Sequence, residues 1–315
     1  MKILVTGAAG FVGSSLCDHL IARGDSVVAL DNFNDYYSPA RKRANLAACA
    51  ASKGFRLVEG DFVQREAMLG LLAAERPDAV AHLGAMGSVR LSVKRPDIYV
   101  QNNIVGTANM LEASQAAGVA RFVFASTSSV YGQTEKIPFV ETDPTDRPLA
   151  PYPASKKSGE VMGHAWHNMF GMNVTALRFF NVYGPRGRPD MMPWIVLESL
   201  LNDREITLFD GGEMRRDWTF IGDIVAGVVA AIDRPLGYEL INLGRGEPIL
   251  MTDFVAILEE ITGRKARVRF VDAPASEPKV TFANVDKARR LLGYDPRTSI
   301  AEGLRQFAAW YRENL

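Results

Sequence analysis

A tyrosine and a lysine four residues apart, Tyr152 and Lys156, are the side chains whose types and spacing most directly suggest chemistry. On a helix this spacing places both side chains on one face, about one turn apart. A nearby ammonium group favours the phenolate, so we expect Lys156 to lower the pKa of Tyr152 from ~10 toward neutrality. A phenol with such a pKa can act as a general base. The pair therefore predicts a proton-transfer site.

The elements that would position this pair alternate between strands and helices over the first 180 residues. Such alternation is typical of a parallel sheet with helices on both faces. The expected fold class is α/β, with a doubly wound parallel sheet formed by 1–180 and rejoined by 217–243. A smaller α/β lobe, mostly C-terminal and binding the substrate, is expected from 181–216 and 244–315. Strands are predicted at 3–6, 26–30, 56–59, 79–83, 121–125 and 174–178, and helices at 14–22, 64–74, 96–117 and 154–170.

A glycine-rich turn with Gly7, Gly10 and Gly13 follows the first predicted strand and precedes a helix. Glycines let the backbone approach a pyrophosphate, and the helix N-terminus supplies amide donors. The alternative is a tight structural turn. Asp31 ends the second strand about 20 residues later, where it can accept from a ribose 2′-hydroxyl and would repel a 2′-phosphate. Together these features predict a Rossmann-type site for NAD rather than NADP.

Composition and charge narrow the class of protein. The 315 residues include 36 Lys and Arg and 36 Asp and Glu, so the chain lacks the basic excess typical of nucleic-acid or membrane partners. Cys17 and Cys49 are the only cysteines, which indicates a reducing compartment. No apolar run reaches the ~18 residues of a membrane span, so we expect a soluble cytoplasmic protein. The pair His164 and His167 has no third ligand pattern, and no metal is expected.

Further motifs follow the glycine turn and Asp31 in order, at 82–85, 103–107 and 126–129, before Tyr152 and Lys156. By these motifs the chain resembles the extended short-chain dehydrogenases over essentially its whole length, specifically the nucleotide-sugar epimerases and dehydratases. The resemblance implies that Thr127 hydrogen-bonds the reacting sugar hydroxyl, Tyr152 takes its proton, and Lys156 holds the nicotinamide ribose. Dehydratases of this family carry an acid pair after the threonine. Because Ser128 and Ser129 stand there instead, dehydration is disfavoured.

The resemblance also implies a tightly bound NAD, regenerated in each turnover, and a homodimer paired through 96–117 and 154–170. Asp61, which follows the third strand, is placed either to meet the adenine amino group or to cap a helix. The residues assigned to the cofactor come from the glycine turn, the strand ends and the catalytic helix. They are Gly7, Gly10, Phe11, Val12, Gly13, Asp31, Asn32, Lys42, Asp61, Phe62, Leu83, Gly84, Ala85, Asn103, Tyr152, Lys156 and Phe179.

Three segments, 31–37, 178–191 and 214–220, look like those of UDP-glucuronate 4-epimerases. This resemblance implies interconversion of UDP-glucuronate and UDP-galacturonate through a transient 4-keto sugar. Related decarboxylases carry glutamate at the position of Ser129, so its serine favours epimerisation. A UDP-glucose 4-epimerase and a UDP-glucuronate decarboxylase stay open as alternatives, and an NAD-sensing regulator is the alternative of another class. The expected substrate-binding residues are Thr127, Ser128, Ser129, Arg90, Asn181, Arg188, Arg216 and Glu277.

Overall fold

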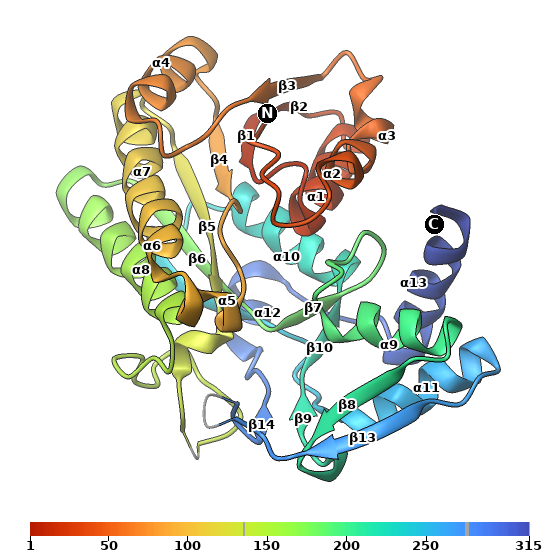
Figure 1. Cartoon of the computed structure of the whole chain (residues 1–315). Coiled ribbons are helices and arrows are strands. Elements are labelled where there is room, and N and C mark those ends of the chain that lie inside the picture. Colours follow the sequence, from red (N-terminus) through yellow and green to blue (C-terminus); the bar gives the residue numbers. More distant parts are fainter. Residues whose placement is uncertain (135, 275–276, 315) are drawn as a thin grey trace.

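The computed structural model describes residues 1–134, 136–274 and 277–314, and a parallel sheet of seven strands forms the centre of its larger lobe (Figure 1). The strand order is β11-β6-β5-β4-β1-β2-β3, and every neighbouring pair is parallel. The six predicted strand segments overlap β1 to β6, and β11 returns to the sheet from later in the chain. The strands are β1 (Lys2–Thr6), β2 (Ser26–Asp31), β3 (Phe55–Glu59), β4 (Ala79–His82), β5 (Arg121–Thr127), β6 (Asn173–Phe179) and β11 (Tyr238–Leu243).

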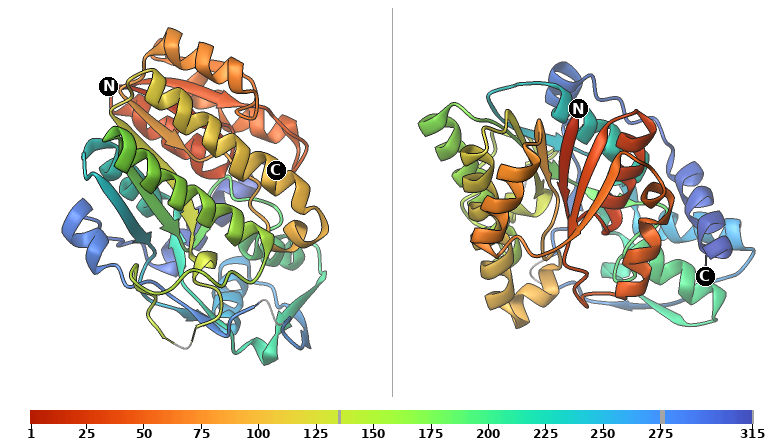
Figure 2. Two further views of the ribbon diagram at one scale, coloured as in Figure 1. Left: turned by 90° about the vertical axis from the view of Figure 1, so that its left-hand side faces the viewer. Right: turned by 90° about the horizontal axis from the view of Figure 1, so that it is seen from above.

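Helices cover both faces of this sheet, as the view from above in Figure 2 shows. Successive residues of a strand point to opposite faces, so Ile3 and Val5 enter one hydrophobic core and Leu4 enters the other. The predicted fold class, a Rossmann-type doubly wound parallel sheet, is confirmed. One face is covered by α4 (Arg65–Glu75), α7 (Gly106–Ala116) and α8 (Pro151–Phe170), and the other by α1 (Phe11–Ala22) and α10 (Ile221–Asp233).

Shorter helical segments connect these elements. The region predicted as one helix, 96–117, consists of α6 (Pro96–Tyr99), a π-helical segment (Val100–Val105) and α7 in direct succession. The others are α2 (Pro39–Asn45), α3 (Ala47–Ala50), α5 (Val89–Lys94), and 3₁₀ turns at Ser128–Tyr131 and Asp210–Gly212.

Helix α8 carries both residues of the predicted catalytic pair. It begins at Pro151 rather than at 154, because proline fits the first turn, where its missing N–H would have no partner. It ends at Phe170 and is capped by Gly171, which adopts the left-handed conformation (φ 68°). At Gly159 a Cβ would collide with the ring of Phe124, so glycine allows α8 to pack closely on β5.

The smaller lobe has its own hydrophobic core, formed by three helices and a parallel pair of strands. These are α9 (Met192–Leu201), α11 (Met251–Thr262), α13 (Ile300–Asn314), β8 (Glu205–Phe209) and β13 (Arg267–Val271). Two small sheets join this lobe to the larger one. They pair β7 (Asn181–Tyr183) with β10 (Trp218–Phe220), and β9 (Arg215–Arg216) with β12 (Ile249–Leu250) and β14 (Val280–Thr281).

One segment differs from the expected division of the chain. Residues 244–315 were all expected in the smaller lobe, but α12 (Asp286–Leu292) packs in the core of the larger one. Its buried Ala288 and Leu292 lie in the same core as Val228 of α10 and Ile241 of β11. The apolar face of α12 therefore covers the edge of the sheet at which β11 is added.

Phe254 on α11 provides a test of the second core. Its ring is wholly buried, with ring centroids 5.2 Å from Trp218 and 6.4 Å from Tyr183. Phe254→Ala should lower the free energy of unfolding by ~3–5 kcal/mol because it leaves a cavity. The matched control Phe270→Ala, at a side chain 54% exposed on β13, should cost less than ~1 kcal/mol. Urea denaturation followed by circular dichroism measures both, and equal losses would contradict this core.

Candidate active site

A cavity of about 910 Å³ lies where the carboxyl ends of the strands face the smaller lobe. Its wall includes Gly7 after β1, Asp31 at the end of β2, Leu83 after β4, Thr127 at the end of β5 and Phe179 at the end of β6. Ligands of open α/β sheets bind at this edge. The smaller lobe contributes the opposite wall through residues of α9, β8 and β9. The cavity is therefore shaped by both lobes.

The glycine turn forms one end of this cavity. Gly7 has a φ of +63°, and a Cβ there would lie 2.7 Å from Cα of Gly84. A Cβ at Gly13 would collide with the carbonyl oxygen of Gly7, so this position also requires glycine. No side chain of the described residues caps the first turn of α1, which begins at Phe11. Its free amide groups and the dipole of the helix suit an anionic group such as a pyrophosphate.

Asp31 lies beside this turn with its carboxylate already oriented. Its Oδ2 accepts from the backbone N–H of Ala9 at 2.9 Å, and its Oδ1 accepts from that of Phe33 at 2.8 Å. A carboxylate has about four lone-pair sites, so both oxygens can still accept from ribose hydroxyls. Lys42 donates twice to Asn34, at 2.7 Å, to its backbone and side-chain oxygens. Asp31 therefore fits the ribose end of a dinucleotide. The Lys42 ammonium is already hydrogen-bonded to Asn34.

Three of the predicted cofactor residues, Asp61, Asn103 and Lys156, do not line the cavity. Asp61 instead accepts from the N–H of Val63 at 3.0 Å and from the side chain of Asn32 at 2.9 Å. Asn103 bonds to Met86 and donates to the Ser155 hydroxyl at 2.9 Å, which connects it to α8. Lys156 is buried, with its Nζ 4.8 Å from the ring centroid of Phe124.

Tyr152 lines the cavity from the first turn of α8, and Thr127 lies opposite at the end of β5. Burial has the largest effect on Tyr152 and raises its pKa, whereas the neighbouring Thr127 hydroxyl and the charge of Arg188 act to lower it. The prediction of a Tyr152 pKa lowered toward neutrality is therefore wrong. Burial also lowers the pKa of Lys156 to about 7, so its ammonium is only partly charged near neutrality.

Hydroxyl groups line the wall next to Tyr152. Thr127, Ser128 and Ser129 all reach the cavity at the start of the 3₁₀ turn. The Thr127 hydroxyl accepts from the backbone N–H of Ser129 and donates to its hydroxyl, both at 3.2 Å. This arrangement provides several small donors, with no acidic side chain among the three.

Arg188 reaches the cavity from the loop that follows β7. Its Nε and Nη2 each bond to Asp190 at 2.9 Å, and its Nη2 also donates to the carbonyl of Gly87 at 3.2 Å. Tyr36 donates its hydroxyl to Asp190 at 2.8 Å. A Cβ at Gly87 would lie 2.6 Å from Arg188 Nη1, so glycine is required for this position of the guanidinium. Although burial opposes it, Asp190 raises the pKa of Arg188.

A second arginine approaches the cavity from the smaller lobe. Arg216 on β9 is almost fully buried and donates to Glu277 at 3.1 Å and to the backbone carbonyls of Arg215 and Lys279. Burial lowers its pKa, and the Glu277 carboxylate opposes this effect. Asn181 lies at the start of β7, and Arg90 lies over the ring of Phe209 at 5.5 Å. All the predicted substrate-binding residues line this one cavity.

Two residues of the site were not singled out from the sequence. Tyr36 and Asp190 hold Arg188 in place, and both line the cavity. They lie inside the segments 31–37 and 178–191, which had drawn attention for their resemblance to other proteins. Their partnership joins positions 154 residues apart, so spacing along the chain gives no sign of it.

The histidines and the helices of the described residues show no sign of a metal site or a membrane span. Among the described residues, no group of three or more His, Cys, Asp or Glu side chains is arranged to hold a metal ion. His167 donates from Nδ1 to the carbonyl of Met172, and His164 packs on Tyr238. Within the same part of the chain, no helix has both the length and the apolar character needed to cross a membrane.

Comparisons with known proteins agree with this fold. The UDP-glucuronate 4-epimerase of Thermodesulfobacterium geofontis is 39% identical, over 99% of this chain and 96% of the relative. UDP-glucuronate 4-epimerase 3 of Arabidopsis thaliana is 41% identical, over 98% of this chain and 76% of the relative. The crystal structure of UDP-glucuronic acid 4-epimerase from Bacillus cereus, in complex with UDP-glucuronic acid and NAD, is 36% identical and covers 99% of both chains with a TM-score of 0.93.

Similarity extends to a neutral-sugar enzyme. The UDP-glucose 4-epimerase of Thermotoga maritima, solved with UDP-glucose, is 31% identical with a TM-score of 0.92 over 99% of both chains. The sequence model of one family matches residues 3–244, which include the glycine turn, Thr127, Tyr152 and Lys156. The chain therefore belongs to the NAD dependent epimerase/dehydratase family.

Proposed function

We propose that this protein is an NAD-dependent 4-epimerase that interconverts UDP-glucuronate and UDP-galacturonate through a transient 4-keto sugar. The observation that carries the proposal is the placement of Tyr152 in one cavity with the glycine turn, the hydroxyls of 127–129 and two arginines. The similarity to the Bacillus cereus enzyme that binds UDP-glucuronic acid and NAD supports it.

The residues at one end of the cavity fit NAD. The glycine turn and the N-terminus of α1 would hold its pyrophosphate, and Asp31 its adenosine ribose. Lys156 does not line the cavity, and its assignment to the nicotinamide ribose rests on the family resemblance alone. When bound, NAD supplies reversible hydride acceptance at carbon 4 of the sugar, with no net redox change over a turnover.

Tyr152 would take the proton from the hydroxyl on carbon 4 and later return it. Since burial raises the pKa of Tyr152, the phenolate needs support from neighbouring groups. Thr127 and Arg188 provide it in this structure, and Thr127 would also hydrogen-bond the reacting hydroxyl. The Arg216 guanidinium can bind diphosphate oxygens in pairs. This would anchor the nucleotide while the keto sugar rotates to present its other face.

A hexuronate substrate can lose its carboxylate as carbon dioxide during this reaction. After oxidation at carbon 4, the carboxylate on carbon 5 belongs to a β-keto acid, which loses carbon dioxide when the breaking bond stands perpendicular to the carbonyl. Thr127, Ser128 and Ser129 offer hydroxyl donors that would hold the carboxylate out of that orientation. None of the three is acidic, so the wall itself does not repel a carboxylate.

A second candidate activity is the 4-epimerisation of a neutral UDP-hexose. The observation in its favour is that Asp190 already occupies two of the Arg188 nitrogens, which reduces the positive charge left for a carboxylate. Asn181 on the cavity wall is also neutral. Both features would permit a sugar with a hydroxymethyl group in place of the carboxylate.

We also propose that the protein is a cytoplasmic homodimer. Exposed apolar side chains lie along the segments that were expected to pair, with Val100 50%, Val161 57% and Met169 66% exposed. Burying such side chains in a second copy is favourable. The buried thiols of Cys17 and Cys49 suit a reducing compartment.

Product analysis tests the proposed reaction. Purified protein incubated with UDP-glucuronate should form UDP-galacturonate as the main product, because the 127–129 wall protects the keto acid. Chromatography with mass spectrometry resolves uronates, pentoses and keto sugars. UDP-xylose or a 4-keto pentose as the main product would show a decarboxylase. Faster conversion of UDP-glucose to UDP-galactose would favour the neutral-hexose activity instead.

Tyr152→Phe tests the proton acceptor. The variant keeps the ring but lacks the hydroxyl, so NAD and UDP-glucuronate should bind within about threefold of wild type while kcat falls ~10²–10⁴-fold. Isothermal titration calorimetry and initial rates measure the two effects. A turnover rate near that of wild type would refute the assignment of Tyr152 as the base.

Lys156→Met tests the cost of burying the lysine. A folded pKa of about 7 against the ordinary lysine pKa of 10.5 means that the folded state bears the full cost of the charge below pH 7, and the cost disappears as the pH rises toward 10.5. In protein freed of nucleotide, the variant should be more stable than wild type by ~4 kcal/mol at pH 6 but only ~1 kcal/mol at pH 9.5. Urea denaturation at both pH values measures this, and a difference independent of pH would contradict it.

A further inference from the structure

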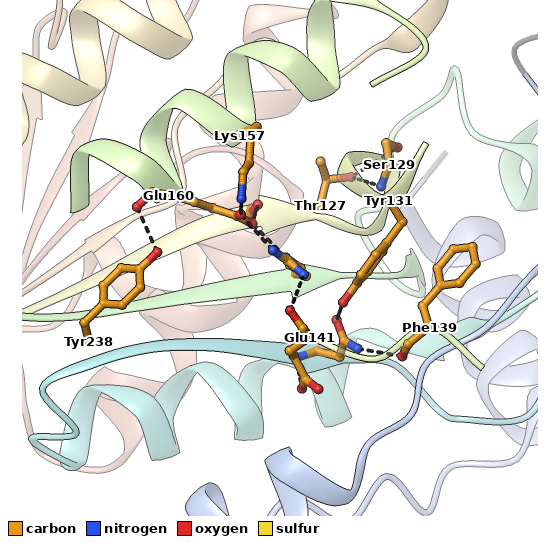
Figure 3. Close-up of polar contacts among 11 residues, drawn as sticks. Thr127, Ser129, Tyr131, Phe139, Glu141, Lys157, Glu160 and Tyr238 are labelled. Carbon is orange, nitrogen blue, oxygen red and sulfur yellow. Dashed lines mark hydrogen bonds and ion pairs between the residues drawn. The ribbon is translucent and has the colours of Figure 1, made fainter. Parts of the chain in front are cut away.

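A buried ion pair joins Glu160 of α8 to strand β6, farther along the helix than Tyr152 and Lys156 (Figure 3). Glu160 receives two hydrogen bonds from Arg178 on β6, Nε to Oε1 at 2.8 Å and Nη2 to Oε2 at 2.9 Å. Both side chains are almost completely buried, at 0% and 1% exposure. The Ser126 hydroxyl, next to Thr127 on β5, donates to the same carboxylate at 2.7 Å. One carboxylate on α8 is therefore bonded to both β5 and β6.

Glu160 continues the line of catalytic residues along the helix. Tyr152, Lys156 and Glu160 are spaced by four, so they lie on one face over two turns. Glu160 is about 12 Å along the helix from Tyr152, too far to touch a sugar bound there. Rotation or sliding of α8 would nevertheless move both residues together. Holding Glu160 in place therefore sets where Tyr152 stands relative to β5.

The sheet provides a matching row of partners. Ser126 on β5, Arg178 on β6 and Asn242 on β11 are paired in register, so they lie side by side across three strands. Tyr131, which packs under the Arg178 guanidinium at 4.7 Å, donates its hydroxyl to Asn242 at 2.6 Å. Helix α8 is thus bonded to a continuous row of polar residues that begins one residue before Thr127.

The row also reaches the wall of the cavity. Asn242 donates to the carbonyl of Phe139 at 3.0 Å, and Arg178 donates to the carbonyl of Glu141 at 3.3 Å. Phe139 lines the cavity, and its backbone bonds to Phe282 and Asn284 of the segment that follows β14. The same contacts that fix α8 therefore also fix part of the cavity wall.

Burying two charges is an inefficient way to stabilise a fold, because the cost of removing them from water offsets most of their attraction. The pair stays ionised here. Although burial opposes it, Arg178 and Ser126 lower the pKa of Glu160, and Glu160 raises that of Arg178. Apolar side chains of similar size commonly stabilise such a site as well or better. Apolar side chains cannot form the directional hydrogen bonds that fix the position of α8 relative to the sheet.

We propose that Glu160 and Arg178 are positioning residues that set the separation between Tyr152 on α8 and Thr127 on β5 for catalysis. This inference rests on the proposed function. Misplacement of reacting groups by about 1 Å can cost ~10²-fold in rate without any loss of a contact to substrate.

The test compares a single and a double variant with wild type. Glu160→Gln removes the charge and leaves Arg178 buried without its carboxylate, so both Tm and kcat should fall. Glu160→Leu/Arg178→Met replaces the pair by apolar groups, so Tm should return to that of wild type. In the double variant kcat should stay ~10–100-fold below wild type, with KM and NAD affinity within about threefold.

Lys157→Met is the matched control, because Lys157 contacts the same carboxylate at 3.1 Å but is 29% exposed. It should keep kcat within about twofold of wild type. A double variant that regains both Tm and kcat would overturn the proposal and leave the pair a purely structural role. Failure of the single variant to fold does not affect this comparison.

Crystal structures of wild type and the double variant separate this inference from the proposed function. If wild type leaves UDP-glucuronate unchanged, the proposed function is wrong, and the separation of the Tyr152 and Thr127 hydroxyls still tests the positioning. A longer or disordered Tyr152–Thr127 separation in the double variant supports the proposal. An unchanged separation contradicts it.

Discussion

The close packing of α8 on β5 is the contact on which the rest of the structure depends. The two catalytic hydroxyls come from different elements, Thr127 from the end of the strand and Tyr152 from the first turn of the helix. Gly159 permits the approach, since any side chain there would collide with Phe124. The Glu160–Arg178 pair then adds directional bonds across β5 and β6. Loss of this packing would separate the base from its partner without changing either residue.

Burial shifts the pKa values of Tyr152 and Lys156 in opposite directions. It raises the pKa of Tyr152 and lowers that of Lys156, so both are disfavoured in their charged forms. The positive charge near the base comes from Arg188, which Asp190, Tyr36 and Gly87 hold in position. The proton acceptor therefore depends on the smaller lobe's loop as well as on its own helix.

Much of the fold could be predicted from the sequence because its signals are local. Alternating apolar segments predicted β1 to β6, and the glycines predicted the turn that opens the cavity, where Gly7 and Gly13 have no room for a side chain. The start of α8 was predicted about one turn too late, because a proline can mark either a break in a helix or its first turn. Residues of α12 were assigned to the wrong lobe because their core partners, Val228 and Ile241, are distant in sequence.

Features of the site that depend on three-dimensional partners could not be predicted. The pKa of Tyr152 follows from its burial, and no spacing between Tyr152 and Lys156 reveals how deeply they lie. Asp61 follows a strand in the expected way, yet its carboxylate bonds to Val63 and Asn32 rather than lining the cavity. The register that brings Ser126, Arg178 and Asn242 together likewise exists only in the folded sheet.

The central claim is that carbon 4 of the sugar is oxidised and then reduced within one closed site. The most direct measurement uses UDP-glucuronate carrying deuterium at carbon 4, with the product analysed by NMR and mass spectrometry. Our account predicts UDP-galacturonate that retains the deuterium at carbon 4, because the hydride leaves and returns without exchange with water. Exchange of that deuterium for solvent hydrogen, or its presence at another carbon, would contradict the account.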